Sequence, residues 1–228
     1  MKKYVNLFVF VFMVGACFSQ GKAQTKSAVS YKNPVVDIAM PDPTVIKAAD
    51  GYFYMYATES TRNVPIMKSK DLVQWTYCNT AFTNKTRPRF EPKAGIWAPD
   101  INYINNKYVL YYAMSVWGGE QTCGIGVATA DSPQGPFTDH GKMFRSNEIG
   151  VQNSIDPSFL QYEGRNYLVW GSFRGIYVIE LTEDGLSLKP GAEKKRIAGT
   201  AFEAAYIHKH GDYSVSYTHL TLPTILRV

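Results

Sequence analysis

Four segments of the 228-residue sequence repeat one pattern, and this repeat constrains the fold more than any other feature. Each segment has an acidic residue, a short apolar stretch, a polar turn, and then a tyrosine followed by apolar residues. The acidic residues lie 58, 56 and 47 residues apart. A period of about 40 to 50 residues built from strand, turn and strand is typical of β-propellers. The segments begin at Asp42, Asp100, Asp156 and Glu203.

Each segment is predicted to form a β-hairpin, because turn-forming residues separate two apolar runs. Two further strands follow in most units, which gives the four strands of one propeller blade. No stretch shows sustained helical periodicity. We therefore predict an all-β fold with three blades and the first hairpin of a fourth. The expected hairpin turns are 49–51, 105–106, 163–164 and 210–212.

The composition agrees with a β-rich globular domain and excludes several other classes. Apolar residues make up 45% of the chain and there are 16 tyrosines, so wholesale disorder is excluded and β structure is favoured. Three cysteines are too few for a disulfide scaffold. The net charge is +5, and the longest basic stretch is 194–196. Nucleic-acid binding is therefore not expected.

The N-terminus has the pattern of an export signal. Lys2 and Lys3 precede an apolar run, 4–14, that is too short to span a bilayer as a helix. The run ends in Val-Gly-Ala-Cys, which resembles a bacterial lipobox with Cys17 as the lipidated residue; cleavage near 23–24 is the alternative. We expect a lipoprotein-type signal peptide over 1–17, a linker over 18–33, and a protein exported to the periplasm or cell surface of a Gram-negative bacterium. Its only membrane contact would be this lipid anchor.

The C-terminal residues differ in character from the repeat. The stretch 215–224, VSYTHLTLPT, back-translates readily into DNA that resembles a transposase sequencing adapter, and the repeat pattern also stops near Ser214. A polar strand followed by a proline turn is the alternative. We predict that the partial propeller domain covers 34–214 and that 215–228 is a non-native tail.

Cys78 and Cys123 remain if the leader is removed. They could form a disulfide in an oxidising compartment, or stay as two buried free thiols. Neither belongs to a Cys-x-x-Cys pair or a Cys/His cluster, so no metal ligand is expected among the residues of this sequence.

The repeated acids point to chemistry at the propeller axis. The first strand of each blade lines this axis, so acidic residues at the starts of these strands should converge on one face. Carboxylates brought together repel one another and their pKa values separate, as a general acid and a general base require. Asp100 has an alternative role, as a turn acceptor after Pro99.

Five motifs together resemble glycoside hydrolase family 43, and within it the arabinanases. The resemblance runs from about residue 36 to 213 and implies a five-bladed β-propeller, of which about three and a half blades are present here. It also implies inverting hydrolysis of α-1,5-linked arabinan. The motifs are PDPTVI at 41–46, GIWAPDI at 95–101, NSIDPSF at 153–159, WGSF at 170–173 and FEAAYIHKHGDY at 202–213.

The resemblance assigns a role to three of the acids. Asp42 would be the general base that activates water, and Glu203 the general acid that protonates the leaving oxygen. Asp156 would raise the pKa of the acid and orient it. Inversion requires a base–acid separation of roughly 6.5–9.5 Å. We expect that separation between Asp42 and Glu203, with Asp156 closer to Glu203.

Four further residues are candidates for binding substrate, each with a structural alternative. Trp97 is a candidate sugar platform or a core tryptophan between blades. Asn153 and Ser154 would hydrogen-bond substrate or cap the following strand, and Phe173 would border the funnel or be buried.

The leading hypothesis is an exported hydrolase of arabinan or arabinoxylan, and two alternatives stay open. One is an exo-acting arabinofuranosidase or β-xylosidase of the same family. The other is a non-catalytic glycan-binding propeller or an inactive fragment. The chemistry requires no cofactor. The resemblance adds a structural calcium near the axis, held by a histidine from a late blade outside this sequence.

Overall fold

The computed structural model describes residues 30–210 and 213–219. The chain divides into two units, Met1–Tyr31 and Lys32–Val228, and the second unit contains every described strand. The predicted signal peptide, with Cys17, lies outside the described residues. So does the centre of the fourth predicted turn, at 211–212.

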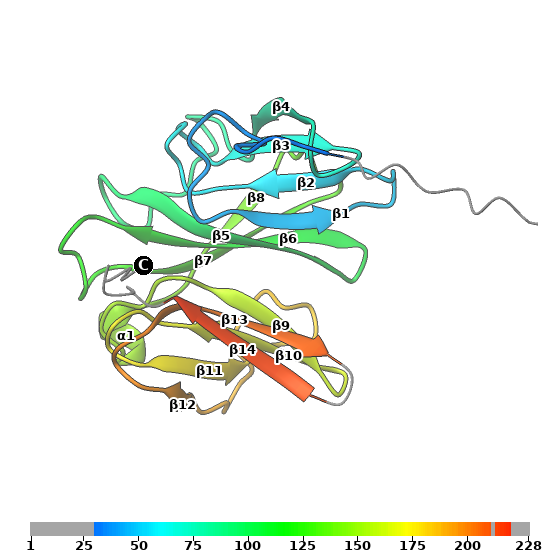
Figure 1. Ribbon diagram of the computed structural model, residues 1–228. Helices are drawn as coiled ribbons and strands as arrows, with labels where there is room; N and C mark the ends of the chain where they lie inside the picture. The colour runs from blue at the N-terminus through cyan, green and yellow to red at the C-terminus, as the bar shows by residue number, and fades with distance from the viewer. Residues whose placement is uncertain (1–29, 211–212, 220–228) are drawn as a thin grey trace, which may run out of the picture. The chain divides into compact units, whose positions relative to one another are not determined.

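Three four-stranded antiparallel sheets and one two-stranded sheet follow one another along the chain (Figure 1). In each sheet the strands pair in chain order, as in a propeller blade. Blade 1 contains β1 (Thr44–Lys47), β2 (Phe53–Tyr56), β3 (Pro65–Ser69) and β4 (Trp75–Thr80); blade 2 contains β5 (Gly95–Ile104), β6 (Lys107–Ser115), β7 (Gly124–Ala130) and β8 (Thr138–Arg145); blade 3 contains β9 (Ser158–Tyr162), β10 (Arg165–Trp170), β11 (Ile176–Glu180) and β12 (Lys195–Ala198); the last hairpin contains β13 (Glu203–His210) and β14 (Tyr213–His219).

The hairpin turns have the chemistry that the sequence predicts. Between β5 and β6, Asn105 and Asn106 have φ values of 47° and 63°. Between β9 and β10, Glu163 and Gly164 have φ values of 49° and 73°. Two consecutive residues with positive φ make the two-residue hairpin turn that matches strand twist, and Asn and Gly tolerate that conformation. These turns fix the register of the inner hairpins in blades 2 and 3.

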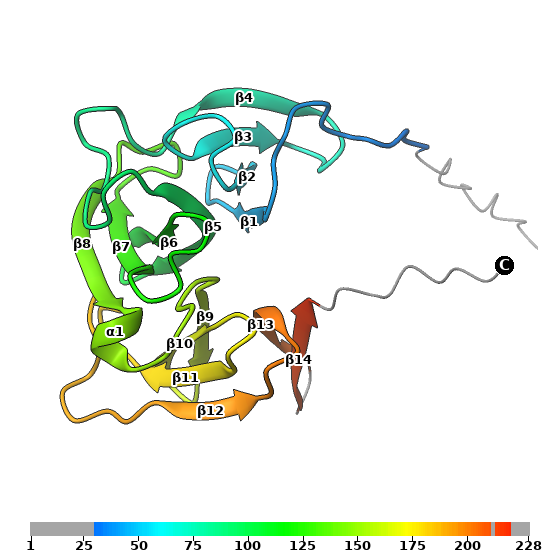
Figure 2. The same ribbon diagram turned by 90° about the vertical axis from the view of Figure 1, so that its left-hand side faces the viewer.

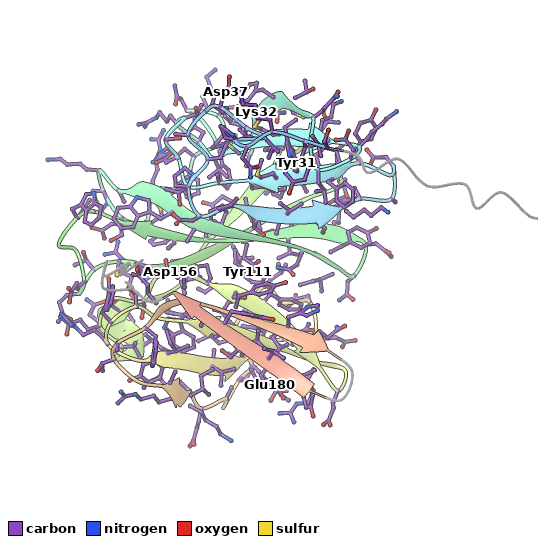
Figure 3. All side chains as sticks on the ribbon, in the orientation of Figure 1. Tyr31, Lys32, Asp37, Tyr111, Asp156 and Glu180 are labelled. Atoms are coloured by element: carbon purple, nitrogen blue, oxygen red, sulfur yellow. The ribbon has the colours of Figure 1, made fainter. Side chains whose placement is uncertain are left out.

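The first strand of each sheet lies on the inner side of the arrangement, and the fourth strands of the blades lie on the outer side (Figure 2). The blades are joined by buried aromatic side chains. Tyr111 of β6, labelled in Figure 3, is fully buried and stacks on Phe159 of β9 with ring centroids 5.8 Å apart. Its hydroxyl donates a hydrogen bond of 2.8 Å to the Gly185 carbonyl in blade 3. Tyr111 therefore holds blades 2 and 3 together.

The core lies between neighbouring sheets, as stacking of blades requires. Between blades 1 and 2, the buried cluster includes Tyr56, Phe82 and Tyr112. Between blades 2 and 3 it includes Phe144 and Trp170, whose rings lie 5.0 Å apart. Burial of a large aromatic side chain contributes a few kcal/mol. These interfaces keep the inner strands at a fixed spacing around the axis.

The prediction of an all-β propeller arrangement with three blades and a further hairpin is confirmed. Five blades remain a prediction, because only part of such a ring is described. Strand β14 continues to His219, so strand pairing extends past the predicted domain boundary at Ser214. The non-native origin of residues 215–228 stays a prediction.

Two smaller sequence questions have structural answers. Cys78 and Cys123 are both free thiols, so the disulfide alternative does not hold in this structure. Within the described ranges, the one helix is α1 (Ser146–Ile149), a single turn after β8. None of the described helical segments is long and apolar enough to cross a membrane.

Candidate active site

Each inner strand has a residue with positive φ shortly before it or within its first four residues, and none of these residues is glycine. Left-handed φ values are costly for residues with a Cβ, although Asp tolerates them better than Ala. In the first three repeats the next residue is proline. We call these four residues the turn residues. They are Asp42 with φ 49°, Ala98 with φ 41°, Asp156 with φ 56° and Ala204 with φ 49°.

Backbone hydrogen bonds between neighbouring sheets show which positions correspond. The Glu59 N–H donates to the Ile96 carbonyl at 3.1 Å, and the Phe173 N–H donates to the Phe202 carbonyl at 2.9 Å. Trp97 and Glu203 each follow these acceptor residues directly, and each precedes a turn residue. Glu203 therefore corresponds to Trp97 rather than to Asp42.

The prediction that all four repeated acids are equivalent is wrong. Only Asp42 and Asp156 are turn residues. Asp100 lies two residues after Ala98, inside β5, where a register shift between Trp97 and Asp100 interrupts the pairing with β6. Asp100 therefore occupies the position of Thr44 and Ser158, two residues after the turn residue.

Asp100 is a structural acceptor at the axis. Its Oδ2 accepts hydrogen bonds from the Phe159 N–H at 2.7 Å and from Asn102 Nδ2 at 2.8 Å. Its Oδ1 accepts from the Thr44 hydroxyl at 3.4 Å. Burial raises the pKa of Asp100 from 3.8 to about 6, and these hydrogen bonds oppose the rise. The acid therefore links strands from three blades, which extends the predicted alternative of a local turn acceptor.

The other three acids line one open cavity of about 660 Å³ at the end of the inner strands. Asp42 and Asp156 precede β1 and β9, and Glu203 begins β13. A second cavity, of about 820 Å³, follows the inner strands and meets the first at Asp42 and Asp156. The structure thus brings together the three residues to which the sequence assigned catalytic roles.

Asp156, labelled in Figure 3, has the most perturbed carboxyl group of the cavity. Burial raises its pKa to about 7, and repulsion from Glu203 and, to a smaller extent, from Asp42 adds to the rise. The Ala204 N–H donates to Asp156 Oδ2 at 3.2 Å and opposes it. The expectation that Asp156 lies closer to Glu203 stays a prediction. The predicted base–acid distance stays a prediction.

Two hydroxyl groups hold the other carboxylates. The Thr58 hydroxyl donates to Asp42 Oδ2 at 2.6 Å, and the Ser172 hydroxyl donates to Glu203 Oε2 at 3.0 Å. Both residues line the same cavity. Our sequence reasoning missed them, although Thr58 and Ser172 both lie two residues beyond the second strand of a repeat.

Aromatic side chains form one wall of the cavity. Trp97 packs partly on a buried cluster, and Trp117 is 94% exposed. Their ring centroids are 5.6 Å apart and both rings line the cavity. Phe173 also lines it and is 37% exposed. Trp117 was missed because the corresponding loop of blade 1, 57–64, contains no aromatic residue to compare it with.

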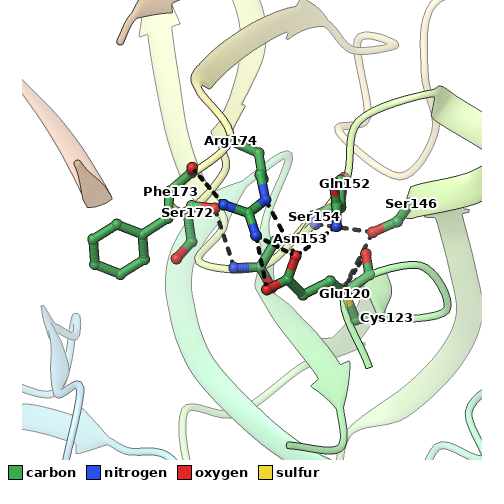
Figure 4. A network of polar contacts seen from close by, with 9 residues as sticks. All are labelled: Glu120, Cys123, Ser146, Gln152, Asn153, Ser154, Ser172, Phe173 and Arg174. Carbon is green, nitrogen blue, oxygen red and sulfur yellow. Dashed lines mark hydrogen bonds and ion pairs between the residues drawn. The ribbon is translucent and has the colours of Figure 1, made fainter. Parts of the chain in front are cut away.

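A polar network joins the loops of blades 2 and 3 along this wall (Figure 4). Glu120 pairs with Arg174 at 2.9 Å and accepts a hydrogen bond of 2.6 Å from Gln152. The Asn153 N–H donates to the Glu120 carbonyl at 2.7 Å. The Asn153 side-chain amide donates to the Ser172 carbonyl at 3.1 Å. Asn153 therefore lies on the cavity, where it connects the Trp117 loop to the strand end that carries Ser172.

Ser154 requires a correction, because its side chain does not reach the cavity. It is 0% exposed, its hydroxyl donates to the Val151 carbonyl at 2.8 Å, and it accepts from the Trp170 indole at 3.1 Å. A group with this burial and these partners stabilises the local fold. Substrate contact through this side chain is excluded in this structure.

The described residues do not fit the calcium ion that the resemblance implies. Within 30–210 and 213–219, no three His, Cys, Asp or Glu side chains are grouped so that they could hold a metal ion. The Asp100 carboxylate at the axis already accepts three hydrogen bonds, so it is not a free ligand. The calcium site stays a prediction about residues outside this sequence.

Antiparallel sheets around an axis, with three carboxylates and two indole rings on one cavity, define a β-propeller with an acidic cluster in its funnel. The chain belongs to glycosyl hydrolases family 43, because the sequence profile of that family matches residues 31–220. Homologues of known name and solved structures agree with this assignment.

Among the relatives is the extracellular endo-α-(1→5)-L-arabinanase 1 of Bacillus subtilis. It is 34% identical over 186 residues, which are 75% of this chain and 56% of the relative. The α-L-arabinanase of Cellvibrio cellulosa superposes with a TM-score of 0.70 at 26% identity, over 79% of this chain and 64% of the other; one of its structures contains arabinohexaose. An exo-1,5-α-L-arabinanase from a bovine ruminal metagenomic library has a TM-score of 0.68 at 29% identity, over 83% and 67%. The chain thus spans just over half the length of the curated relatives it matches.

Proposed function

We propose that this chain carries the catalytic end of an inverting glycoside hydrolase that cleaves α-1,5-linked arabinan. One observation carries the proposal: Asp42, Asp156 and Glu203 come from three different sheets and line one open cavity. A cluster of carboxylates is costly to assemble, because like charges repel, and such clusters are typical of functional sites. The family assignment supports glycosidic bonds as the target.

The proposed reaction uses Asp42 and Glu203 on opposite sides of the sugar. Asp42 takes a proton from a water molecule as its oxygen attacks the anomeric carbon. Glu203 gives a proton to the glycosidic oxygen as the bond to it breaks. Inversion follows because the water attacks from the face opposite the leaving group, with roughly 6.5–9.5 Å between the two carboxyl groups.

Asp156 would keep a proton available for this step. Asp156 and Glu203 repel each other when both are ionised, and burial raises the pKa of Asp156 to about 7. Two coupled acids titrate as a pair. The pair should therefore hold one proton up to about neutral pH, which is what a general acid needs to work near pH 7.

The aromatic wall supports a neutral sugar as substrate. Trp97 and Trp117 both line the cavity, and aromatic rings pack well on the apolar faces of sugars. Arabinan is the substrate class in the names of the relatives, and a related structure contains arabinohexaose. Both endo- and exo-acting relatives occur. We propose endo action, with exo action as the alternative.

The decisive experiment is an assay on linear arabinan. We expect the wild type to release arabinose or short oligomers, with the first-formed product in the anomeric configuration opposite to that of the cleaved bond, as measured by proton NMR. Mixed oligomers indicate endo action and monosaccharide alone indicates exo action. Glu203→Gln should abolish hydrolysis, because the amide cannot donate the proton.

Two outcomes would contradict the proposal. Retention of anomeric configuration would exclude the inverting mechanism. Binding of arabinan oligomers with no hydrolysis, equal in wild type and Glu203→Gln, would establish the glycan-binding alternative. The indole rings alone are sufficient for that role.

The location of the protein is also a proposal. The leader has the pattern of an export signal, and the Bacillus subtilis relative is named as extracellular. We propose an exported enzyme, anchored through lipidated Cys17 in the periplasm or at the cell surface of a Gram-negative bacterium. Labelling with a radioactive fatty acid, compared between wild type and Cys17→Ser, tests this anchor.

A further inference from the structure

We infer that Thr58 and Ser172 are positioning residues, which hold one oxygen each of Asp42 and Glu203 and thereby fix which oxygen acts on water or on the leaving group. This inference rests on the proposed function. It adds two uncharged side chains, contributed by the ends of the second strands of blades 1 and 3, to the three acids.

The direction of the Thr58 hydrogen bond is fixed by its surroundings. The Ala98 N–H donates to Thr58 Oγ1 at 2.6 Å, so one lone pair of the hydroxyl is occupied. The hydroxyl proton is then directed to Asp42 Oδ2, 2.6 Å away. The Thr58 N–H also donates to the Pro41 carbonyl at 2.9 Å, which holds the backbone of Thr58 beside the residue before Asp42. Thr58 is therefore a preorganised donor.

Asp42 depends on this donor for its orientation. Among the described residues, Thr58 supplies the one hydrogen bond to the Asp42 carboxylate that the structure shows. Asp42 is exposed to the cavity, and without that bond its carboxyl group is free to rotate about its last bond. A bond to Oδ2 leaves Oδ1 for water, and fixed orientation of a reacting group lowers the barrier.

Ser172 acts in the same way on the proposed acid. It is 1% exposed, and its backbone pairs with Glu203 as an isolated antiparallel bridge. Its hydroxyl donates to Glu203 Oε2 at 3.0 Å. A donated bond disfavours a proton on Oε2, so the transferable proton belongs on Oε1. The Asn153 amide, which donates to the Ser172 carbonyl at 3.1 Å, holds this segment from the other side.

The two hydroxyls have corresponding places in the fold. Each precedes the residue whose N–H bonds to the next sheet, Glu59 after Thr58 and Phe173 after Ser172. The end of the second strand thus supplies a hydroxyl donor in both blades. Thr58 donates to Asp42 of its own blade, whereas Ser172 donates to Glu203 of the following sheet.

The test uses the full chain with linear arabinan as substrate. Thr58→Val removes the donor at constant shape, Thr58→Ser restores it, and Ser172→Ala removes the second donor. Thr80→Val and Ser69→Ala are matched controls, because they remove hydroxyl hydrogen bonds of blade 1 that lie outside both cavities. The readouts are kcat, KM, thermal unfolding, and the side-chain carboxyl-carbon NMR resonances of Asp42 and Glu203 at one fixed pH.

We expect Thr58→Val and Ser172→Ala each to lower kcat by about 10- to 100-fold with KM changed less than about twofold. Thr58→Ser should return kcat to within about threefold of the wild type. The carboxyl-carbon resonance of the acid whose donor is lost should move, and that of Asp42 should return in Thr58→Ser. The two controls should lower thermal stability without changing kcat.

An unchanged kcat and unchanged resonances in Thr58→Val and Ser172→Ala would overturn the inference. So would loss of kcat that Thr58→Ser does not restore, since that pattern indicates a packing role. If the wild type hydrolyses no glycan, the proposed function fails. The resonances then decide alone: movement supports the positioning of the carboxyl groups, and its absence overturns it.

Discussion

The inner strands of blades 2 and 3 begin alike but place their acids in different surroundings. In blade 3 the turn residue is itself acidic, and Asp156 lines the open cavity. In blade 2 the turn residue is Ala98, and the acid follows two positions later as Asp100. Asp100 accepts hydrogen bonds from three blades at the axis. A displacement of two residues thus separates an acid on the open cavity from one that holds three blades together.

The left-handed turn residue explains why two positions matter so much. In a regular strand, residues two apart point to the same side. The left-handed residue breaks that rule: the turn residues line both cavities, whereas the second residues after them line only the second cavity, the axial one. Thr44, Asp100 and Ser158 occupy this second position in the three blades, and all of them line the axial cavity.

The largest expected effect comes from replacing the acid of blade 3. Asp156→Asn should lower kcat/KM on arabinan by at least about 100-fold, because the pair with Glu203 loses its shared proton. It should not lower stability at pH 8. The pKa of Asp156 is raised to about 7 by burial, so the ionised form is the costly one there. Steady-state kinetics and urea unfolding measure the two effects, and destabilisation by Asp156→Asn would contradict this reading.

The acid of blade 2 should show the reverse behaviour. Asp100→Ala removes the acceptor for the partly buried Phe159 N–H and the Asn102 amide. An unsatisfied buried donor costs about 1–3 kcal/mol, so we expect a loss of about 2–3 kcal/mol in the free energy of unfolding at pH 5. Asp100→Asn keeps one acceptor and should lose less. Equal stability of Asp100→Ala and the wild type in urea would show that the axial hydrogen bonds contribute nothing.

The pH dependence of activity tests the raised pKa of Asp156 in enzyme that still turns over substrate. The wild type should lose kcat/KM as pH rises through about 7, because the proton of the Asp156–Glu203 pair leaves there. In the residual activity of Asp156→Asn the alkaline limb should move to lower pH, since the repulsion that retains the proton is gone. If the alkaline limb of Asp156→Asn lies at the same pH as that of the wild type, the limb belongs to a group outside the Asp156–Glu203 pair.

The pH dependence of stability tests the blade 2 acid. Burial raises the folded-state pKa of Asp100 from 3.8 to about 6, so its contribution is fully present below about pH 4 and is lost as pH rises through 6. Between pH 5 and pH 8 this loss is about 1–1.5 kcal/mol. Subtracting the unfolding curves of Asp100→Asn from those of the wild type isolates it. A difference that does not change with pH would exclude a raised pKa.

The smallest expected effect concerns the turn residue of blade 2. Ala98 has φ 41°, a conformation that glycine adopts without strain. Ala98→Gly should therefore raise the free energy of unfolding by about 0.5 kcal/mol, because the relief of strain exceeds the added flexibility of the unfolded chain. Urea unfolding compares it with Ala113→Gly in the adjacent strand β6, which should be destabilising.

The sequence repeat predicts much of this architecture, because turn chemistry and alternation are local properties. The hairpins at 105–106 and 163–164 form as expected, and Asp42, Asp156 and Glu203 reach one cavity. Asp100 was misassigned because the repeats were aligned on their acids; alignment on the residue before proline places Ala98 beside Asp42 and Asp156, and Asp100 two positions later.

Two other differences have causes of their own. Ser154 was expected at the cavity but is enclosed by Val151 and Trp170, and burial depends on packing between segments distant in sequence. Trp117 was missed because the corresponding loop of blade 1, 57–64, has no aromatic residue, so comparison of the repeats does not identify it. Repeats predict the elements that recur, whereas irregular loops and bulges depend on tertiary contacts.

The turn residues alternate between aspartate and alanine along the four sheets, and this affects how the acidic cluster can change by mutation. Ala98 and Ala204 already have the backbone conformation that Asp42 and Asp156 have, and both line the cavity. An alanine codon ending in a pyrimidine becomes an aspartate codon through one base change, and aspartate tolerates this conformation better than alanine. The scaffold therefore offers two sites at which a new acidic group is one mutation away, with no rearrangement of the backbone.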